Sequence, residues 1–156
     1  MELREKAIEN LKNARKKIDF ADHMTYITFP IIKENRLLIK ILLEIHKALS
    51  LFISGILQYE NYYKRIRLYK EHDNNFKTFI RISAKYDISE QEISKIKEIF
   101  LIVKKHKSSA FEFTKSGKFI IMLNSQTISV SLEKIKEYLN SSKNIIKKVE
   151  NKIKET

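Results

Sequence analysis

Tyrosines alternate with basic residues in one short stretch of this 156-residue chain, a combination that can bind nucleic acid. Aromatic rings stack on exposed bases, and lysine and arginine side chains hold phosphates. The residues proposed for this role are Lys64, Arg65, Arg67 and Lys70, with Tyr63 and Tyr69 as stacking candidates. The same residues can instead close one end of a helical bundle, because tyrosine's ring suits a packed helix rim while its hydroxyl stays in water. The sequence leaves both interpretations open.

The net charge of +12 points in the same direction, since a strongly basic protein attracts acidic partners such as nucleic acid. However, most of the basic residues are lysine, and isoleucine and asparagine are also abundant. Codon bias in an A/T-rich genome produces that composition without any function. Two further basic clusters consist of Lys104, Lys105 and Lys107, and of Lys143, Lys147, Lys148, Lys152 and Lys154. If these clusters converge on one side, the nucleic-acid interpretation becomes stronger.

Several kinds of chemistry are excluded by residue types. The chain has no cysteine, so it forms no disulfide and has no thiol nucleophile or cysteine-based zinc site. Its two glycines, Gly55 and Gly117, lie far apart, whereas a phosphate-cradling loop needs clustered glycines. The four histidines are also widely spaced, and His46 is interpreted as the polar edge of a packed helix. We therefore predict neither a metal site nor a cofactor.

Apolar periodicity predicts two long helices in the first half of the chain. From Glu2 to about residue 26, apolar residues recur at spacings of three and four, and many of them are alanine. Pro30 disfavours helical backbone in the residue before it, so this helix should end at or before Phe29. A second helix should run from about residue 34 to 66, with Gly55 packed closely on the first. Residues 1–66 are thus expected to form a long antiparallel helix hairpin.

The second half should add shorter helices, a small sheet and a last helix. Residues 70–75 are polar and predict a turn, and a shorter helix should span about 76–86. Ser89 and Glu92 have the spacing of a capping box that opens a helix to about residue 106, within the region 76–107 of shorter helices. Residues 110–130 alternate and predict a β-hairpin or meander, and residues 131–153 predict the final helix. The fold class is therefore mainly α, a four- to five-helix bundle in a single domain over 1–156.

The N-terminus shows no apolar signal core, and the most apolar stretch, residues 37–57, contains Lys40, Glu44 and Lys47. Charges of this kind are costly in a bilayer, so the stretch predicts a buried helix and not a membrane span. We expect a cytoplasmic protein that has no membrane partner.

The helical pattern resembles the HEPN superfamily of small helical domains. The resemblance covers about the first half of the chain and rests on two segments, residues 22–30 (Asp22-His-Met-Thr-Tyr-Ile-Thr-Phe-Pro30) and residues 47–65. Some members of this superfamily are metal-independent ribonucleases, some are partners of nucleotidyltransferases, and some lack a catalytic motif. Many form homodimers through a helix face.

The resemblance also implies a catalytic pair. Members that cleave RNA carry an arginine followed, after four to six residues, by a histidine, and Arg67-Leu-Tyr-Lys-Glu-His72 has that spacing. In such a reaction the ribose 2′-hydroxyl attacks the neighbouring phosphate. Histidine then transfers protons and arginine stabilises the developing negative charge. The same segment also fits a solvated basic helix end, where cations complement the helix dipole.

Three functions remain open on this basis. The leading prediction is a non-catalytic helical binding module that contacts RNA, or a protein that works on RNA, through basic helix faces and forms a homodimer. The second is a metal-independent ribonuclease that uses Arg67 and His72. The third is a protein-binding adaptor whose charge reflects composition alone.

Overall fold

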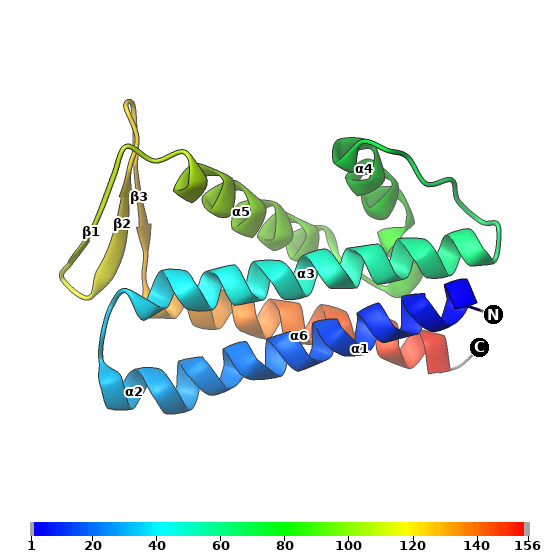
Figure 1. The fold of residues 1–156 in the computed structure, drawn as a ribbon, viewed down its shortest axis with the longest axis horizontal. Helices are drawn as coiled ribbons and strands as arrows, with labels where there is room; N and C mark the ends of the chain where they lie inside the picture. The colour runs from blue at the N-terminus through cyan, green and yellow to red at the C-terminus, as the bar shows by residue number, and fades with distance from the viewer. Residues whose placement is uncertain (1, 155–156) are drawn as a thin grey trace.

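The two longest N-terminal helices form the predicted antiparallel hairpin. The computed structural model describes residues 2–154 and is mainly α, as predicted. Helix α1 (Glu2–His23) lies along α3 (Leu37–Tyr62), with the chain reversing direction between them (Figure 1). A Cβ on Gly55 of α3 would lie 2.9 Å from Cγ of Leu11 and 3.2 Å from the carbonyl oxygen of Ala7. The predicted close packing at Gly55 is therefore present.

Helix α1 ends at His23, before Phe29 as predicted, but the expectation that the residue before Pro30 leaves the helical region is wrong, because Phe29 has helical backbone angles. Helical backbone continues past α1 through a π-helical turn (Met24–Thr28) and a short helix, α2 (Phe29–Ile32). In an α-helix, the ring of Pro30 would collide with the carbonyl four residues earlier. The wider π turn, in which the Phe29 N–H donates to the Met24 carbonyl, relieves this collision and leaves Pro30 in the first turn of α2. The helical run stops at Lys33, which has a left-handed φ of 55°.

Helix α3 ends earlier, and the next helix starts earlier, than the sequence predicts. Helix α3 stops at Tyr62 and not near residue 66, because Lys64 adopts a left-handed φ of 60°. Residues 63–71 form an irregular connection, which we call the α3–α4 loop. Helix α4 (His72–Ile82) begins within the predicted turn at 70–75, and a 3₁₀ turn, η2 (Ser83–Tyr86), follows it.

The second half otherwise follows the prediction. Helix α5 (Glu90–Lys107) opens on the predicted capping box, in which the Ser89 Oγ accepts from the Glu92 N–H at 3.1 Å. Strands β1 (Phe111–Lys115), β2 (Lys118–Met122) and β3 (Thr127–Val130) form an antiparallel meander in that order. Ser131 caps α6 (Leu132–Lys154), because its Oγ accepts from the Lys134 N–H at 3.2 Å.

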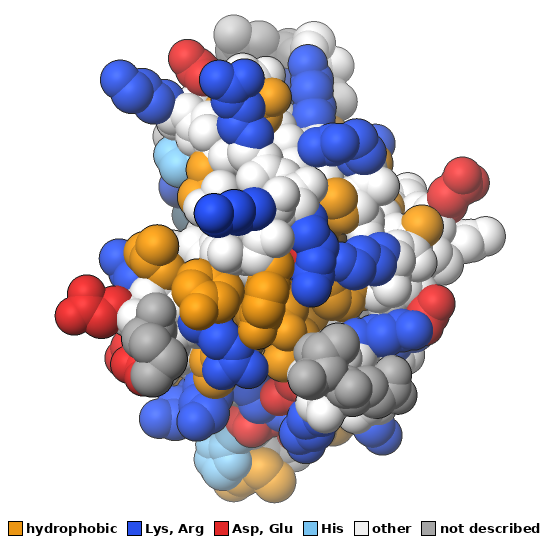
Figure 2. All heavy atoms as spheres, turned by 90° about the vertical axis from the view of Figure 1, so that its right-hand side faces the viewer, with side chains coloured by type: hydrophobic (Ala, Val, Ile, Leu, Met, Phe, Trp, Pro, Cys, Tyr) orange, Lys and Arg blue, Asp and Glu red, His pale blue; other side chains and the backbone are white. Residues whose placement is uncertain are grey.

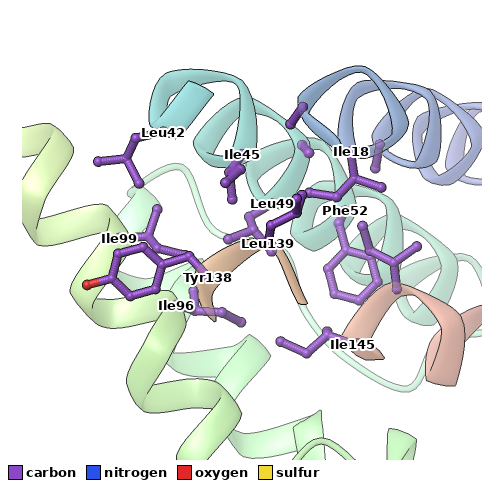
Figure 3. Packing of buried hydrophobic residues seen from close by; sticks show 14 of the residues in the cluster. Ile18, Leu42, Ile45, Leu49, Phe52, Ile96, Ile99, Tyr138, Leu139 and Ile145 are labelled. Atoms are coloured by element: carbon purple, nitrogen blue, oxygen red, sulfur yellow. The ribbon is translucent and has the colours of Figure 1, made fainter. Parts of the chain in front are cut away.

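One cluster of buried side chains joins these elements. It draws residues from α1, α3, α4, α5, α6 and the strands β2 and β3. Figure 3 shows side chains from several of these elements pointing toward one another, among them Ile18, Leu49, Ile96, Ile99 and Leu139. The small sheet lies at one end of the bundle, and the α3–α4 loop lies at the other (Figure 1). Within residues 2–154, no helix combines the length and apolar character needed to cross a membrane.

Candidate functional site

All six residues predicted to bind nucleic acid lie in the α3–α4 loop. Their side chains are exposed, and the loop follows the end of α3 instead of continuing it. The expectation of a basic helix face is therefore wrong for these residues, because the left-handed backbone at Lys64 ends the helix before them. Figure 2 views this end of the molecule, where lysine and arginine side chains surround a central group of hydrophobic side chains.

A buried carboxylate anchors the start of the loop. Glu60, which is 1% exposed, accepts hydrogen bonds from Lys85 Nζ at 2.5 Å, Arg65 Nη1 at 2.7 Å and the Tyr86 hydroxyl at 2.9 Å. Burial alone would raise the pKa of Glu60, but the hydrogen bonds from Lys85, Arg65 and Tyr86 outweigh it and lower that pKa. The guanidinium of Arg65 also lies 4.8 Å from the ring centroid of Tyr63. Arg65 therefore stabilises the start of the loop through its ion pair with Glu60.

The far end of the loop is fixed by one amide side chain. Asn75 accepts from the Tyr69 N–H through Oδ1 and donates to the Tyr69 carbonyl through Nδ2, each at 2.8 Å. The loop is therefore held at both ends, and Ile66 packs against the core, while Lys64, Arg67 and Lys70 are exposed. Arg67 lies 5.9 Å from the ring centroid of Tyr69. Among the described residues, no carboxylate forms an ion pair with Lys64, Arg67 or Lys70, so these cations are available to a ligand.

Arg67 and His72 have different surroundings in the structure. His72 is exposed at the start of α4 and borders two cavities, whereas Arg67 lines neither of them. Within the described chain, no hydrogen bond joins the two side chains. A catalytic role for this pair stays a prediction.

The α3–α4 loop borders a groove that lies between α3, α4 and α5. This groove consists of two pockets. The loop-side pocket has a volume of about 340 Å³ and takes Leu68 and Tyr69 from the loop. The lysine-side pocket has a volume of about 450 Å³. Both pockets share His72, Phe76 and Phe100, so they adjoin along these side chains, and we call the two together the α3–α4–α5 groove.

The two parts of the groove carry different chemistry. Ser50, Ser54 and Gln58 of α3 bring polar groups to the loop-side pocket. The lysine-side pocket is lined by Lys97, Lys104 and Lys107 of α5, by His46 of α3 and by one carboxylate, Asp73. Within the described residues, none of the three lysines forms an ion pair, so the pocket is positively charged overall.

His46 reports that positive charge. Burial lowers the pKa of His46, and the nearby charges of Lys107 and Lys47 lower it further. Its ring packs edge-on against Phe100 with centroids 4.9 Å apart, and Phe76 lies 5.5 Å from Phe100 on the same surface. His46 is thus a half-buried member of the groove wall.

Sequence reasoning missed the groove, although a signal for it existed. His46, Ser50, Ser54 and Gln58 repeat every four residues, so they form one polar row on a helix whose other faces are apolar. Such a row on a largely buried helix indicates a surface that the bundle leaves uncovered. The basic cluster at 104–107 was recognised, but its position opposite His46 depends on how α5 packs.

The third basic cluster is largely neutralised. Lys148 pairs with Glu92 at 2.7 Å, Lys152 pairs with Asp87 at 3.5 Å, and Lys143 pairs with Asp22. These lysines of α6 support the bundle instead of forming a free surface. The cations that remain unpaired around the α3–α4 loop and the groove are consequently the better candidates for binding an anion.

In the described part of the chain, no group of three or more histidine, aspartate or glutamate side chains is placed to hold a metal ion. The fold and site thus define a mainly α protein that carries an open, basic and partly aromatic groove. Comparison with known proteins adds no relative, since no family model, curated protein or solved structure matches the chain.

Proposed function

We propose that this protein is a non-catalytic RNA-binding module of HEPN-like architecture, which engages single-stranded RNA through the α3–α4 loop and the α3–α4–α5 groove. The observation that carries the proposal is the position of the unpaired cations. Arg67 and Lys70 project from an anchored loop whose neighbouring residue Tyr69 borders the groove, and unpaired lysines line the groove itself. Single strands suit this surface because their bases are free to stack on exposed aromatic side chains.

A homodimer is part of the proposal, because many HEPN-like domains pair through a helix face. Pairing would extend the basic surface and increase RNA affinity through two linked contacts. Sedimentation of the purified protein tests this part separately from RNA binding.

The test is binding of labelled single-stranded RNA in EDTA at about 50 mM and about 200 mM salt, where counterion release makes affinity fall steeply. The variant Arg67→Gln/Lys70→Gln should bind more weakly and show a shallower salt dependence, by about 0.7 in the logarithmic slope for each lost phosphate contact. The matched control is Lys115→Gln/Lys118→Gln, which removes the same charge at the β1–β2 turn, at the other end of the molecule.

Equal losses in both variants would show that total charge, and not this surface, drives binding. RNA cleavage in EDTA that disappears in His72→Ala would instead establish the ribonuclease alternative. Absence of any binding at the lower salt concentration would favour the protein-binding adaptor.

A further inference from the structure

The loop-side pocket has the chemistry of a site for a flat heterocycle. The pocket is lined by the aromatic side chains of Tyr69, Phe76 and Phe100 and by the apolar side chains of Ile53 and Leu57. Aromatic and apolar walls with a few placed polar groups are typical of sites for small flat ligands. The pocket volume, about 340 Å³, lies at the lower end of the range for small-molecule sites, roughly 300–1,000 Å³.

Polar groups in the same pocket can read the edge of such a heterocycle. Gln58 accepts a hydrogen bond from Asn10 Nδ2 through Oε1 at 2.7 Å, which orients its amide and leaves its NH₂ group to donate. The hydroxyls of Ser50 and Ser54 lie one and two helical turns from His46 on the same row. These groups donate and accept, as the edges of nucleobases require.

The neighbouring lysine-side pocket has the chemistry of a phosphate site. Among the described residues, Lys97, Lys104 and Lys107 form no ion pair, and the pocket that they line contains one carboxylate, that of Asp73. Lysine binds phosphate as a compact point charge. Because His72, Phe76 and Phe100 belong to both pockets, one ligand can occupy both at once.

We propose that the α3–α4–α5 groove is a nucleotide subsite, with a nucleobase in the loop-side pocket and its phosphate beside Lys104 and Lys107. Phe100 lines both pockets. The inference rests on the proposed RNA-binding function and makes it more specific. It assigns the groove to one nucleotide unit of the strand, and it leaves the α3–α4 loop to hold the neighbouring phosphates.

The experiment compares three probes by calorimetry and by amide chemical shifts: adenosine 5′-monophosphate, adenosine and ribose 5-phosphate. The subsite predicts that the monophosphate binds at least about tenfold more tightly than either fragment, because it fills both pockets. Shifts should cluster at Ser54, His72 and Lys104. Equal affinity for the monophosphate and ribose 5-phosphate would overturn the proposal, since the base would then contribute nothing.

Two variants separate the pockets. Ser54→Phe, at an exposed position of α3, should fill the loop-side pocket and reduce affinity for the monophosphate to that for ribose 5-phosphate. Lys104→Gln/Lys107→Gln should reduce the affinity for the monophosphate to the affinity for adenosine. The matched controls are Ser125→Phe, at an exposed position between β2 and β3, and Lys115→Gln/Lys118→Gln. Thermal unfolding confirms that each variant is folded.

The outcomes also separate this inference from the proposed function. If Ser54→Phe and Ser125→Phe weaken binding of the monophosphate equally, the subsite is wrong. If the protein binds single-stranded RNA in a salt-dependent way but does not bind the monophosphate, the subsite is likewise wrong and RNA binding stands. Binding of the monophosphate that depends on both pockets, without RNA binding, supports the subsite and contradicts the RNA-binding module.

Discussion

Arg65 Nη1 lies 2.7 Å from Glu60 Oε2, so this arginine near the start of the α3–α4 loop is tied to a carboxylate that is almost completely buried. Glu60 also accepts hydrogen bonds from Lys85 and from the Tyr86 hydroxyl. One acidic side chain therefore holds together the end of α3, the start of the loop and the turn η2. This contact fixes where the loop begins, while Arg67 and Lys70 further along it remain exposed.

Replacing this carboxylate should weaken the fold. Glu60→Gln keeps the shape of the side chain but loses the charge on which Arg65 and Lys85 depend. Both cations are partly exposed, so we expect a decrease of about 1–3 kcal/mol in the free energy of unfolding. Urea unfolding measures this free energy, and Glu9→Gln, at an exposed position of α1, is the control. A change no larger than that of the control would show that Glu60 does not stabilise the loop.

The same carboxylate should make stability depend on acidity. Burial raises the pKa of Glu60, but the hydrogen bonds from Lys85, Arg65 and Tyr86 lower it more, so the folded value lies below the ordinary one of 4.5. The stabilisation is therefore fully present above the ordinary pKa and is lost as pH falls through the lowered folded value. The stability difference between the wild type and Glu60→Gln should shrink from neutral pH to about pH 3. A constant difference would contradict this assignment.

Local sequence patterns predicted the parts of the fold that local forces determine. Apolar spacing indicated α1 and α3, and the Ser89–Glu92 box marked the start of α5, because each depends on residues close in the chain. The π turn before Pro30 was missed, since nothing local shows that helical backbone can accommodate that proline. The pairing of Glu60 with Lys85 and the meeting of His46 with the lysines of α5 depend on tertiary packing, which periodicity does not specify.

Gly55 should be required for the close approach of α1 and α3. In an isolated helix, Gly55→Ala would stabilise by about 1 kcal/mol. Here the added methyl group would lie 2.9 Å from the Leu11 side chain and 3.2 Å from the Ala7 carbonyl oxygen. We therefore expect the free energy of unfolding to fall by about 1–3 kcal/mol. The double variant with Leu11→Ala should show a smaller penalty for the methyl group, because its main obstacle is removed. A stabilising Gly55→Ala would contradict the close approach.

Asn75 should hold the loop at Tyr69. Asn75→Ala removes both hydrogen bonds to the Tyr69 backbone, so the Tyr69 amide should exchange its hydrogen with solvent faster, while amides in the middle of α3 keep their protection. Native-state hydrogen exchange measures this difference. The control is the neighbouring Asn74→Ala, whose side chain donates a long hydrogen bond of 3.4 Å to Glu71 and, within residues 2–154, none to the Tyr69 backbone. Equal exchange rates in the two variants would show that Asn75 does not clamp the loop.

His46 gives a direct measure of charge in the groove. Burial is the largest cause of its lowered pKa, and the positive charges of Lys107 and Lys47 add to it. Lys107→Gln should therefore raise the pKa of His46, whereas Lys40→Gln, at an exposed position elsewhere on α3, should leave it unchanged. Histidine side-chain resonances followed by NMR across a pH titration report the value. An anion bound beside Lys107 should raise it as well, because negative charge favours the imidazolium.

The lowered pKa of His46 also determines how the stability of the fold changes with pH. A histidine whose folded pKa lies below its unfolded value binds a proton more readily in the unfolded state, so it destabilises the fold as pH falls below about 6.5. Inorganic phosphate at saturating concentration should reduce that acid sensitivity if it occupies the lysine-side pocket, since it brings the folded pKa of His46 back toward the unfolded one. The Lys104→Gln/Lys107→Gln variant should lose this response to phosphate. If phosphate stabilises the wild type and this variant equally at low pH, its effect arises elsewhere on the surface and the groove is not the anion site.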